Sequence, residues 1–561
     1  MNNYSLDTIR KEIIGNDLVF DTPFGKRHLL YVDYTASGRA VKRIENKIQN
    51  ILNSYGNTHT EDDYSGKYLT QLLKQAEEKI KKIINAGDNG KIIMVGSGAT
   101  GALKKLQEII GVYIPPLTKE IIYNSIEKCN KSQSNEIISN MEKCRPVVFI
   151  GPYEHHTNEL MWRESFAEVV VINLDDSGMI DLKDLKQKIS NPKYNDRKKI
   201  GSFSAGSNVT GIRTSVYEIA KICHKFDTIV FFDYAAVAPY IKIDMNKDNE
   251  SYFDAIFFSP HKFLGGPGTC GVLVFNEKIY RKDLPPTTAG GGTVVYVGFE
   301  SHDFDKNIET REKAGTPPIL QAIKAALVMD LKEKIGTDII DDIELKYSKF
   351  FVEKLKKIKN VEIIGEISSD HRIPIVSFNI NHKDRILHPK FVAKLLNDLF
   401  GIQSRAGCSC AGPYGHILLN IDHITSTKYR NLIVKGCEGI KPGWVRMNIH
   451  YTLKKEDINY IVNTIKFIAS FGYLFLLKYD FDIKTGEWKH IELKSYTSKF
   501  SIENDFQVDK INIIDLENIR NSYFKEAKKM AIELKKDFDN SFNKDVDEIE
   551  DLKYFYYHNK I

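Results

Sequence analysis

The chain reads DAIFFSPHKFLGGPG from Asp254 to Gly268. An apolar run of strand length leads into a turn of Ser, Pro, His and Lys, and a Gly-rich segment follows. Lysine is common and is usually a solvated surface charge, but Lys262 comes off the end of a strand that reads as buried. A lysine in such a turn can hold an aldehyde cofactor as a Schiff base, and the small residues leave room for a phosphate. Lys262 therefore defines the predicted active site.

The length and composition bound the kinds of protein that this chain can be. Its 561 residues are too many for one hydrophobic core, so two or three domains are expected. A hydrophobic share of 42% is sufficient for a packed interior. The formal charge of +5 arises from 79 basic and 74 acidic residues, a near balance that gives no case for nucleic acid or an acidic membrane as partner. We expect a soluble protein.

The cysteines and the N-terminal sequence favour a reducing compartment. The cysteine number is odd and small for the length, which is untypical of a disulfide framework. We find no apolar segment before a small-residue cleavage site and no apolar run of membrane-spanning length, so the cytoplasm is the expected location. The seven cysteines are Cys129, Cys144, Cys223, Cys270, Cys408, Cys410 and Cys437.

The first half of the chain predicts an α/β fold. Short apolar runs bounded by turns occur at 92–95, 147–150, 169–172, 228–232, 255–258 and 271–275. Helical patterns such as 68–84 and 216–226 lie between several of them. Alternation of this kind predicts a mainly parallel sheet covered by helices on both faces, with its ligand at the carboxyl ends of the strands.

The rest of the chain predicts a second domain and an extension. Helical tracts and strands after the first domain read as a smaller α+β domain that includes an amphipathic helix near 458–468. Beyond it, a hairpin at 475–493 and a charged helix at 516–536 are predicted. The predicted divisions are an N-terminal segment at 1–27, a large domain at 28–317 with an insertion at about 115–145, a small domain at 318–472 and an extension at 473–561.

Several motifs in this order resemble the class V aminotransferase and cysteine desulfurase family over residues 28–470. The S-x-H-K motif ends at Lys262, which the resemblance makes the Schiff-base residue of pyridoxal phosphate on the type I aminotransferase fold. The resemblance adds Ser259 and His261 as phosphate ligands. The loop Gly96–Gly101, after a strand and before a helix, is similar to the family's small-residue loop and places Ala99 and Thr100 at the phosphate.

Three further polar residues are implied to surround the cofactor ring. Asp233 ends a strand, where a carboxylate can pair with the pyridine nitrogen, although such aspartates are often turn formers. The segment EHHTN at 154–158 resembles the family motif whose first histidine stacks on the ring, here His155. Two zinc ligands or surface histidines are the alternative for that pair. The segment SNVTG at 207–211 places Asn208 near the ring's 3-oxygen.

One loop implies a dimer, and one position departs from the family. The segment EKAGTP at 312–317 resembles a loop whose threonine reaches the phosphate of the neighbouring subunit, so Thr316 predicts a homodimer with shared sites. The family usually has glutamine three residues after the aspartate, but Ala236 stands there. Alanine has no side-chain hydrogen bond to offer, so the electronics of the ring are expected to differ from those of typical desulfurases.

The segment RAGCSCAGP at 405–413 implies the reaction. It resembles the loop of Suf-type desulfurases, with Arg405 binding the substrate carboxylate and Cys410 as the nucleophile. The expected reaction removes sulfur from L-cysteine: Lys262 moves the α-proton, the Cys410 thiolate takes the sulfur as a persulfide, and alanine is released. A sulfur-acceptor protein is a possible partner. No metal is expected.

Other functions stay open at this stage. Cys408 and Cys410 can be a metal-ligand pair, a redox couple or small buried thiols, and Cys408 can relay sulfur or protect Cys410. The chain can also be another class V enzyme, an aminotransferase or a carbon-sulfur or carbon-selenium lyase, in which Cys410 is not the nucleophile. A third possibility is a regulatory protein that kept the fold and lost the chemistry, against which Lys262 and Asp233 speak.

Overall fold

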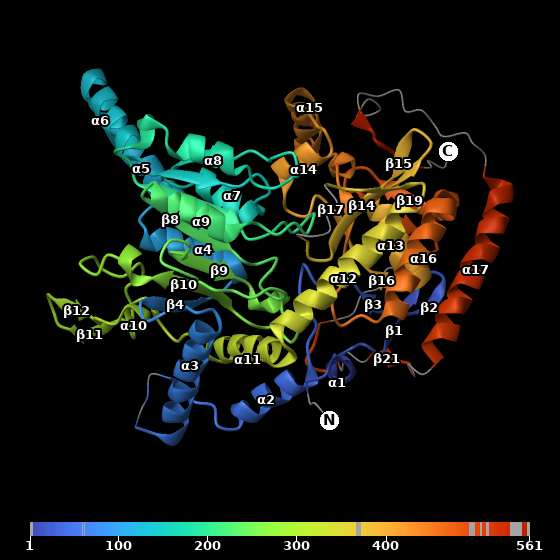
Figure 1. Ribbon diagram of the computed structural model, residues 1–561, viewed down its shortest axis with the longest axis horizontal. Coiled ribbons are helices and arrows are strands. Elements are labelled where there is room, and N and C mark those ends of the chain that lie inside the picture. The colour runs from blue at the N-terminus through green and yellow to red at the C-terminus, as the bar shows by residue number, and fades with distance from the viewer. Residues whose placement is uncertain are drawn as a thin grey trace. The chain divides into compact units, whose positions relative to one another are not determined.

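The computed structural model describes residues 4–58, 60, 62–365, 372–492, 500–504, 508–511, 515–538 and 552–557 (Figure 1). The chain divides into two compact units, and each is described by itself. The large unit comprises residues 1–5, 37–207 and 212–341, and the small unit comprises 6–36, 208–211 and 342–561.

A seven-stranded sheet forms the centre of the large unit. All strand pairs on one side of it are parallel, and β10 alone runs antiparallel to both of its neighbours. In spatial order the strands are β4 (Gly90–Val95), β10 (Gly271–Asn276), β9 (Ala255–Phe258), β8 (Thr228–Asp233), β7 (Lys199–Ser204), β5 (Val147–Ile150) and β6 (Glu168–Val171). The predicted mainly parallel sheet with helices on both faces is confirmed, and all six predicted strands belong to it.

Strand β7 was not predicted, because polar residues interrupt its apolar pattern. Ser202 and Ser204 are nevertheless almost fully buried. The hydroxyl of Ser202 donates to Asn158 at 2.6 Å, and that of Ser204 donates to Glu154 at 2.6 Å. A buried hydroxyl with a partner costs little, so the partners on another segment make this strand possible.

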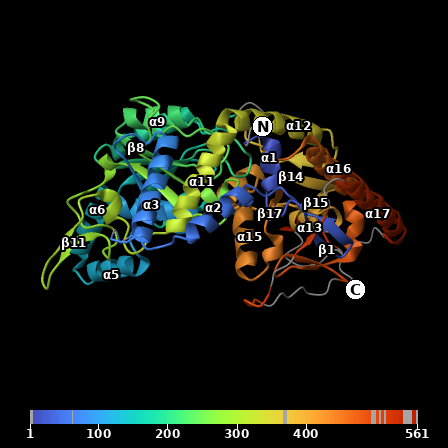
Figure 2. The ribbon, with the colours of Figure 1, turned by 90° about the horizontal axis from the view of Figure 1, so that it is seen from below.

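Helices cover both faces of this sheet (Figures 1 and 2). The predicted helices at 68–84 and 216–226 are confirmed as α3 and α9. The helices of the unit are α2 (Lys42–Leu52), α3 (Tyr64–Ile83), α4 (Gly98–Ile109), α5 (Pro116–Glu127), α6 (Lys131–Cys144), α7 (His156–Arg163), α8 (Leu182–Ile189), α9 (Val216–Lys225), α10 (Ile308–Arg311) and α11 (Ile319–Ile335). Helices α5 and α6 span the residues at which an insertion is predicted, and β11 (Val294–Val297) and β12 (His302–Phe304) form a hairpin.

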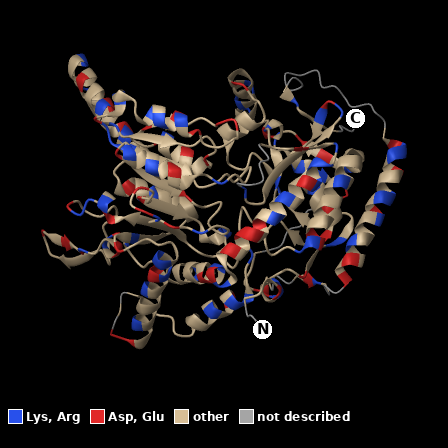
Figure 3. Ribbon diagram, in the orientation of Figure 1, with Lys and Arg blue, Asp and Glu red and all other residues tan. Residues whose placement is uncertain are grey.

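The long helical tract after Pro318 is divided in two. Gly336 has a φ of 101°, a conformation that glycine adopts readily, and it separates α11 from α12 (Thr337–Lys356). Helix α11 packs on α3 and α2 of the large unit, so the contacts place the division after Asp341, within α12, whereas the sequence puts it at 317/318. Basic and acidic residues are interspersed along α12 (Figure 3).

The small unit has a larger antiparallel sheet and three small ones. The larger sheet follows the order β17 (Arg405–Gly407), β18 (Trp444–Asn448), β14 (Ile375–His382), β15 (Arg385–Leu387) and β22 (Phe555–Tyr556), with β13 (Val361–Ile363) also on β14. Among the described strand pairs of this larger sheet, only β15 and β22 are parallel. The others are β2 (Gly25–His28) with β1 (Leu18–Thr22) and β21 (Asp509–Lys510), β16 (Ile402–Gln403) with β3 (Leu30–Tyr31), and the hairpin β19 (Tyr479–Asp482) with β20 (Glu487–His490).

Helices pack on these sheets around a large hydrophobic cluster, and a smaller cluster contains Tyr429, Ile440 and Leu552. The helices are α1 (Leu6–Glu12), α13 (Pro389–Phe400), α14 (Gly412–Leu418), α15 (His423–Val434), α16 (Lys455–Phe471) and α17 (Leu516–Asp537). The predicted apolar face of α16 is buried, with Ile458, Ile461 and Ile465 fully covered. Among the described residues, the stretch Lys455–Lys478 alone is long and apolar enough to cross a membrane; 67% of its most apolar window is buried in the protein, as in a core helix of a soluble protein.

The C-terminal extension is part of this unit. The predicted hairpin is confirmed but is shorter, because 472–478 forms a 3₁₀ helix, η6 (Gly472–Lys478). The predicted charged helix is α17, and its residues Tyr523, Ala527 and Ala531 are buried in the core. The extension therefore contributes to the packing of the small unit.

Candidate active site

Most of the predicted cofactor residues lie at one edge of the large unit's sheet. Strands β4, β9, β8, β7 and β5 all run in one direction, since β4 and β9 are both antiparallel to β10. Their carboxyl ends therefore meet at the same edge, where an open α/β sheet binds its ligand. The predicted residues that end or follow these strands are Ala99, Thr100, His155, Asp233, Ser259, His261 and Lys262.

The loop before α4 is a cradle that an anion fits. The backbone N–H of Ala99 donates to the Ser259 hydroxyl at 2.8 Å, which joins this loop to the lysine turn. A Cβ at Gly98, where φ is 59°, would lie 2.8 Å from that hydroxyl, so only glycine fits there. Ser97 at the N-cap makes no side-chain hydrogen bond to the helix, and helix N-termini with uncapped N–H groups attract phosphates.

Asp233 is a buried acid beside the lysine turn. Its carboxylate accepts a hydrogen bond from the N–H of Ala235 at 2.8 Å, and the residue is 4% exposed. Burial raises the pKa of Asp233 to about 6, while the hydrogen bond and the positive charge of Lys262 act in the opposite direction. A carboxylate in such a place gains free energy when it pairs with a cationic ring nitrogen.

The lysine turn is held firmly by the backbone around it. Lys262 ends a short 3₁₀ helix, η2 (Pro260–Lys262), directly after β9. The carbonyl of His261 accepts a hydrogen bond from the Gly38 N–H at 2.8 Å, and a Cβ at Gly266 would lie 2.0 Å from the Pro260 carbonyl oxygen. Burial lowers the pKa of His261 to about 4, with the neighbouring Lys262 charge adding to the effect. His261 is therefore neutral near pH 7, with one ring nitrogen able to donate.

His155 is fixed by its own helix. It is the N-cap of α7, and its Nδ1 accepts a hydrogen bond from the Thr157 N–H at 3.1 Å. The neutral ring therefore carries its proton on Nε2. Thr157 in turn shares a hydrogen bond of 2.8 Å with the hydroxyl of Thr100, which connects α7 to the anion cradle.

Glu154 was not singled out by the sequence, although it supports this edge of the sheet. Its carboxylate accepts hydrogen bonds from the Gly151 N–H at 3.0 Å, from the Ser204 N–H at 2.9 Å and from Asn158 at 2.6 Å. Burial raises the pKa of Glu154 to about 7. The carboxylate thereby links the ends of β5 and β7 and holds the segment that bears His155.

Two other predicted positions of the large unit have different surroundings. Thr316 is exposed and accepts a hydrogen bond from Asn57 at 3.2 Å. Its loop is anchored by the buried Glu312, which accepts hydrogen bonds from Tyr280 and Thr287, each at 2.6 Å. Ala236 is 8% exposed and offers no side-chain hydrogen bond.

The predicted thiol loop lies in the small unit and has a strained backbone. Strand β17 carries Arg405, which is exposed, and the loop begins at Gly407. Ser409 and Cys410 both have positive φ angles, 54° and 57°. Residues with a Cβ adopt this left-handed conformation at a cost of about 1–2 kcal/mol each, and such strain gathers at functional sites.

Asn208 supports the thiol loop. Its side-chain amide donates to the carbonyl oxygen of Ser409 at 2.7 Å, and both residues belong to the small unit. The predicted role of Asn208 at the cofactor's 3-oxygen stays a prediction. The bond found here fixes the middle residue of the strained turn.

Arg446 is a site residue that the sequence analysis missed. It is 2% exposed, its guanidinium donates to the Asn208 carbonyl at 3.1 Å and to the Asp33 carboxylate at 2.9 Å, and it pairs with Arg405 across β17 and β18. Burial lowers the pKa of Arg446, and Asp33 and Cys410 oppose this change. The available signal was one charge within the otherwise apolar strand WVRMN at 444–448.

In the part of the chain that the structure describes, no three His, Cys, Asp or Glu side chains gather closely enough to hold a metal ion.

The class-V aminotransferase family matches residues 30–137 and 132–461, well over half of the chain. This chain belongs to the class-V aminotransferase family. The residues of the class-V signature that the sequence offers thus lie partly at the sheet edge of the large unit and partly in the thiol loop of the small unit.

Curated members of the class-V family that resemble this chain are described as probable cysteine desulfurases. The one from Staphylococcus aureus strain Mu50 is 27% identical over 471 residues, which cover 83% of this chain and 98% of that protein. The one from Halalkalibacterium halodurans is 28% identical over 400 residues, which cover 70% of this chain and 87% of that protein.

Solved class-V structures share the fold. The apo cysteine desulfurase from Thermococcus onnurineus NA1 has a TM-score of 0.64 at 23% identity, covering 83% of this chain and 98% of that chain. The cysteine desulfurase CsdA from Escherichia coli has a TM-score of 0.57 at 20% identity, covering 78% and 93%. The family match ends at residue 461, so the whole C-terminal extension, 473–561, lies outside it.

The raised pKa of Glu154 predicts that the free energy of unfolding of this protein depends on pH. In the unfolded chain the carboxyl ionises near its ordinary value of 4.5, but in the folded protein it ionises near 7. Between these values the folded state keeps a proton that the unfolded state has released, so stability falls as pH rises. Relative to Glu154→Gln, the wild type is expected to lose about 3 kcal/mol between pH 4.5 and 7. Urea unfolding of both proteins over this pH range measures the difference in their free energies of unfolding. A difference that stays constant with pH would contradict the prediction.

Proposed function

We propose that this chain is a pyridoxal-phosphate-dependent cysteine desulfurase that converts L-cysteine into L-alanine and a persulfide on Cys410. The observation that carries the proposal is the thiol loop. Cys410 stands at the end of a strained turn, held by Asn208 through Ser409, and Arg405 lies on the strand that leads into that turn. The relatives described as probable cysteine desulfurases support the same reaction.

The residues of the large unit fit the proposed cofactor. The uncapped start of α4 and the Gly98 cradle suit its phosphate, with Ser259 and His261 beside them. Asp233 suits the ring nitrogen, because a buried carboxylate without a cation is unfavourable, and Lys262 suits the aldehyde. When bound, pyridoxal phosphate supplies an electron sink for bond breaking at the α- and β-carbons of an amino acid.

The protein's own groups then have separate tasks. The exposed Arg405 binds the substrate carboxylate through two parallel N–H donors. The ε-amine of Lys262 removes the α-proton and later returns a proton to carbon. His155, fixed by Thr157, covers the ring and presents Nε2–H.

Cys410 performs the sulfur transfer. Its thiolate attacks the sulfur of the substrate, a sulfur–sulfur bond forms, and the carbon–sulfur bond breaks with its electron pair passing to the β-carbon. That carbon takes up a proton, so the organic product is alanine and the sulfur remains on Cys410. Arg405 and Arg446 are paired across the adjacent strands β17 and β18, so two cationic side chains flank the start of the thiol loop.

The test is mass spectrometry of the purified protein after addition of L-cysteine. We expect alanine in solution and one added sulfur atom on the peptide that bears Cys410, both dependent on pyridoxal phosphate.

A second function, amino-group transfer by a class-V aminotransferase, is favoured by one observation: Ala236 removes a hydrogen bond that is usual in desulfurases. Amino transfer from L-cysteine to an oxo acid, without persulfide, would replace the first proposal by this one.

We also propose a homodimer and a protein acceptor for the sulfur. The hairpin of β11 and β12 leaves Val295, Val297 and Phe299 exposed, and the exposed Thr316 follows it in the chain. Exposed apolar side chains on a projecting hairpin favour an interface with another chain. Because the predicted active sites are shared between subunits, that chain is a second copy of this protein. Sedimentation of the holoenzyme measures this, and a monomer mass would refute it.

A further inference from the structure

The last described segment of the chain belongs to the sheet that carries the thiol loop. Strand β22 pairs with β15, with Phe555 opposite Ile386 and Tyr556 opposite Leu387. The other edge of the same sheet is β17, from which the thiol loop starts. Phe555 is fully buried, so this end of the chain is firmly docked. It lies beyond the part of the chain that the class-V family matches.

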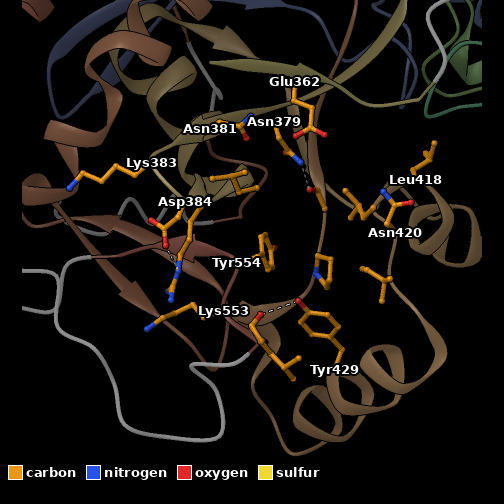
Figure 4. A pocket seen from close by; sticks show the side chains of 17 residues that line it. Glu362, Asn379, Asn381, Lys383, Asp384, Leu418, Asn420, Tyr429, Lys553 and Tyr554 are labelled. Carbon is orange, nitrogen blue, oxygen red and sulfur yellow. Dashed lines mark hydrogen bonds and ion pairs between the residues drawn. The ribbon is translucent and has the colours of Figure 1, made fainter. Parts of the chain in front are cut away.

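The residues before β22 contact the segment 440–443. Leu552, 8% exposed, packs with Ile440 and Tyr429. The Tyr429 hydroxyl donates to the Leu552 carbonyl at 3.0 Å (Figure 4). The hydroxyl of Tyr554, on a half-buried ring, donates to the carbonyl of Lys441 at 2.6 Å. Two hydrogen bonds and one apolar contact thus connect the tail to this segment and to α15.

The segment 440–443 in turn touches the first residue of the thiol loop. A Cβ at Gly443 would lie 2.7 Å from the backbone carbon of Gly407, so the two backbones are in direct contact. The next residue, Trp444, pairs with Gly407 across β17 and β18. A shift of this segment therefore moves Gly407, from which the strained residues Ser409 and Cys410 continue.

Two cavities border the segment 440–443. One cavity, about 680 Å³, is lined by Leu552, Tyr554 and Gly443 (Figure 4). The other, about 290 Å³, is lined by Cys408, Lys441 and Trp444. Pro442 lines both, so the segment 440–443 is a wall that the two cavities share at this residue. The tail adds an apolar contact at Ile440 and a hydrogen bond at Lys441 to this wall.

We propose that the segment 552–554 is a positioning element of the active site: it holds the wall 440–443 against Gly407 and so keeps the thiol loop in its strained, reactive form. Strained backbone persists only where the surroundings determine it, and here the determining contacts include the tail. Tyr554 and Leu552 act through the wall and touch no reacting atom. The catalytic consequence rests on the proposed function, whereas the effect on the loop does not.

Two substitutions and two matched controls test this. Tyr554→Phe removes the hydroxyl that bonds to Lys441, and Tyr556→Phe removes a neighbouring hydroxyl that bonds to Asp384, away from the wall. Leu552→Ala removes the contact with Ile440, and Leu534→Ala truncates an equally buried leucine of α17, since both are 8% exposed. The readout is the rate at which iodoacetamide labels Cys408 and Cys410, divided by the labelling rate of the exposed Cys129 on the insertion.

We expect the labelling ratio to rise by about three-fold to ten-fold in Tyr554→Phe and Leu552→Ala, the range that loss of one modest contact gives. The ratio should stay within about two-fold of the wild type in both controls. Equal ratios in all four variants, or the same rise in Leu534→Ala as in Leu552→Ala, would overturn the proposal. In the holoenzyme with L-cysteine, we expect the two tail variants to lower kcat and leave KM unchanged. A wild type without persulfide would refute the proposed function, and the labelling ratios would still decide the role of the tail.

Discussion

Replacement of Lys262 by alanine is expected to lower the rate of alanine release from L-cysteine by about 10²–10⁴-fold or more, because the proposed reaction needs an amine to move the α-proton. Lys262 ends the short helix η2 that comes after β9, and its turn is braced by the contacts of His261 with Gly38 and of Gly266 with Pro260. A change of the side chain alone therefore leaves the turn intact. The measurement is the steady-state rate of alanine formation at saturating L-cysteine.

Two controls separate loss of the amine from loss of the fold. Lys262→Arg keeps the positive charge but holds its proton too tightly to act as a base, so it should be as inactive as the alanine variant. A small added amine should restore part of the activity of Lys262→Ala only. Borohydride treatment of the wild type should attach the cofactor to the peptide with Lys262. Full activity in Lys262→Ala, or attachment to another lysine, would contradict the assignment.

The sheet edge of the large unit could be predicted because its signals are local. Apolar runs of four or five residues gave six strands of the central sheet, and the residues after their ends gave Asp233 and Lys262. Strand β7 could not be predicted, since Ser202 and Ser204 become acceptable in a core only through Asn158 and Glu154. Such long-range partners leave no mark in the sequence of the strand itself.

The small unit shows the same limit more clearly. Arg446 reads as an anomaly in an apolar strand until Asp33, more than four hundred residues away in sequence, is seen beside it. The positive φ angles of Ser409 and Cys410 have no sequence signal either, because glycine marks such positions and neither residue is glycine. The loop was predicted from its resemblance to the loop of Suf-type desulfurases, but its strain and its support by Asn208 are products of the tertiary structure.

Replacement of Cys410 by alanine is expected to abolish the persulfide and to lower alanine release by at least about 10³-fold, the scale of losing a nucleophile. The visible absorption of bound pyridoxal phosphate should remain, because the proposed cofactor residues other than Asn208 belong to the large unit and Cys410 belongs to the small unit. Measurement of the absorption band, alanine and added sulfur in one sample gives all three results. A variant that still released alanine at the wild-type rate would identify a lyase or an aminotransferase.

Cys408→Ala is the matched control, since this thiol lies two residues away in the same loop and is also half-buried. Cys410 has the left-handed backbone and the nearby charge of Arg446, whereas Cys408 lines the cavity of about 290 Å³ beside Trp444. If Cys410 alone is the nucleophile, Cys408→Ala should form persulfide at a rate within about two-fold of the wild type. If Cys408 relays sulfur, the wild type should carry added sulfur on both residues after longer incubation, and Cys408→Ala should keep all of it on Cys410. The strained backbone and the support of the turn by Asn208 favour the first outcome, because both concern the turn that ends at Cys410.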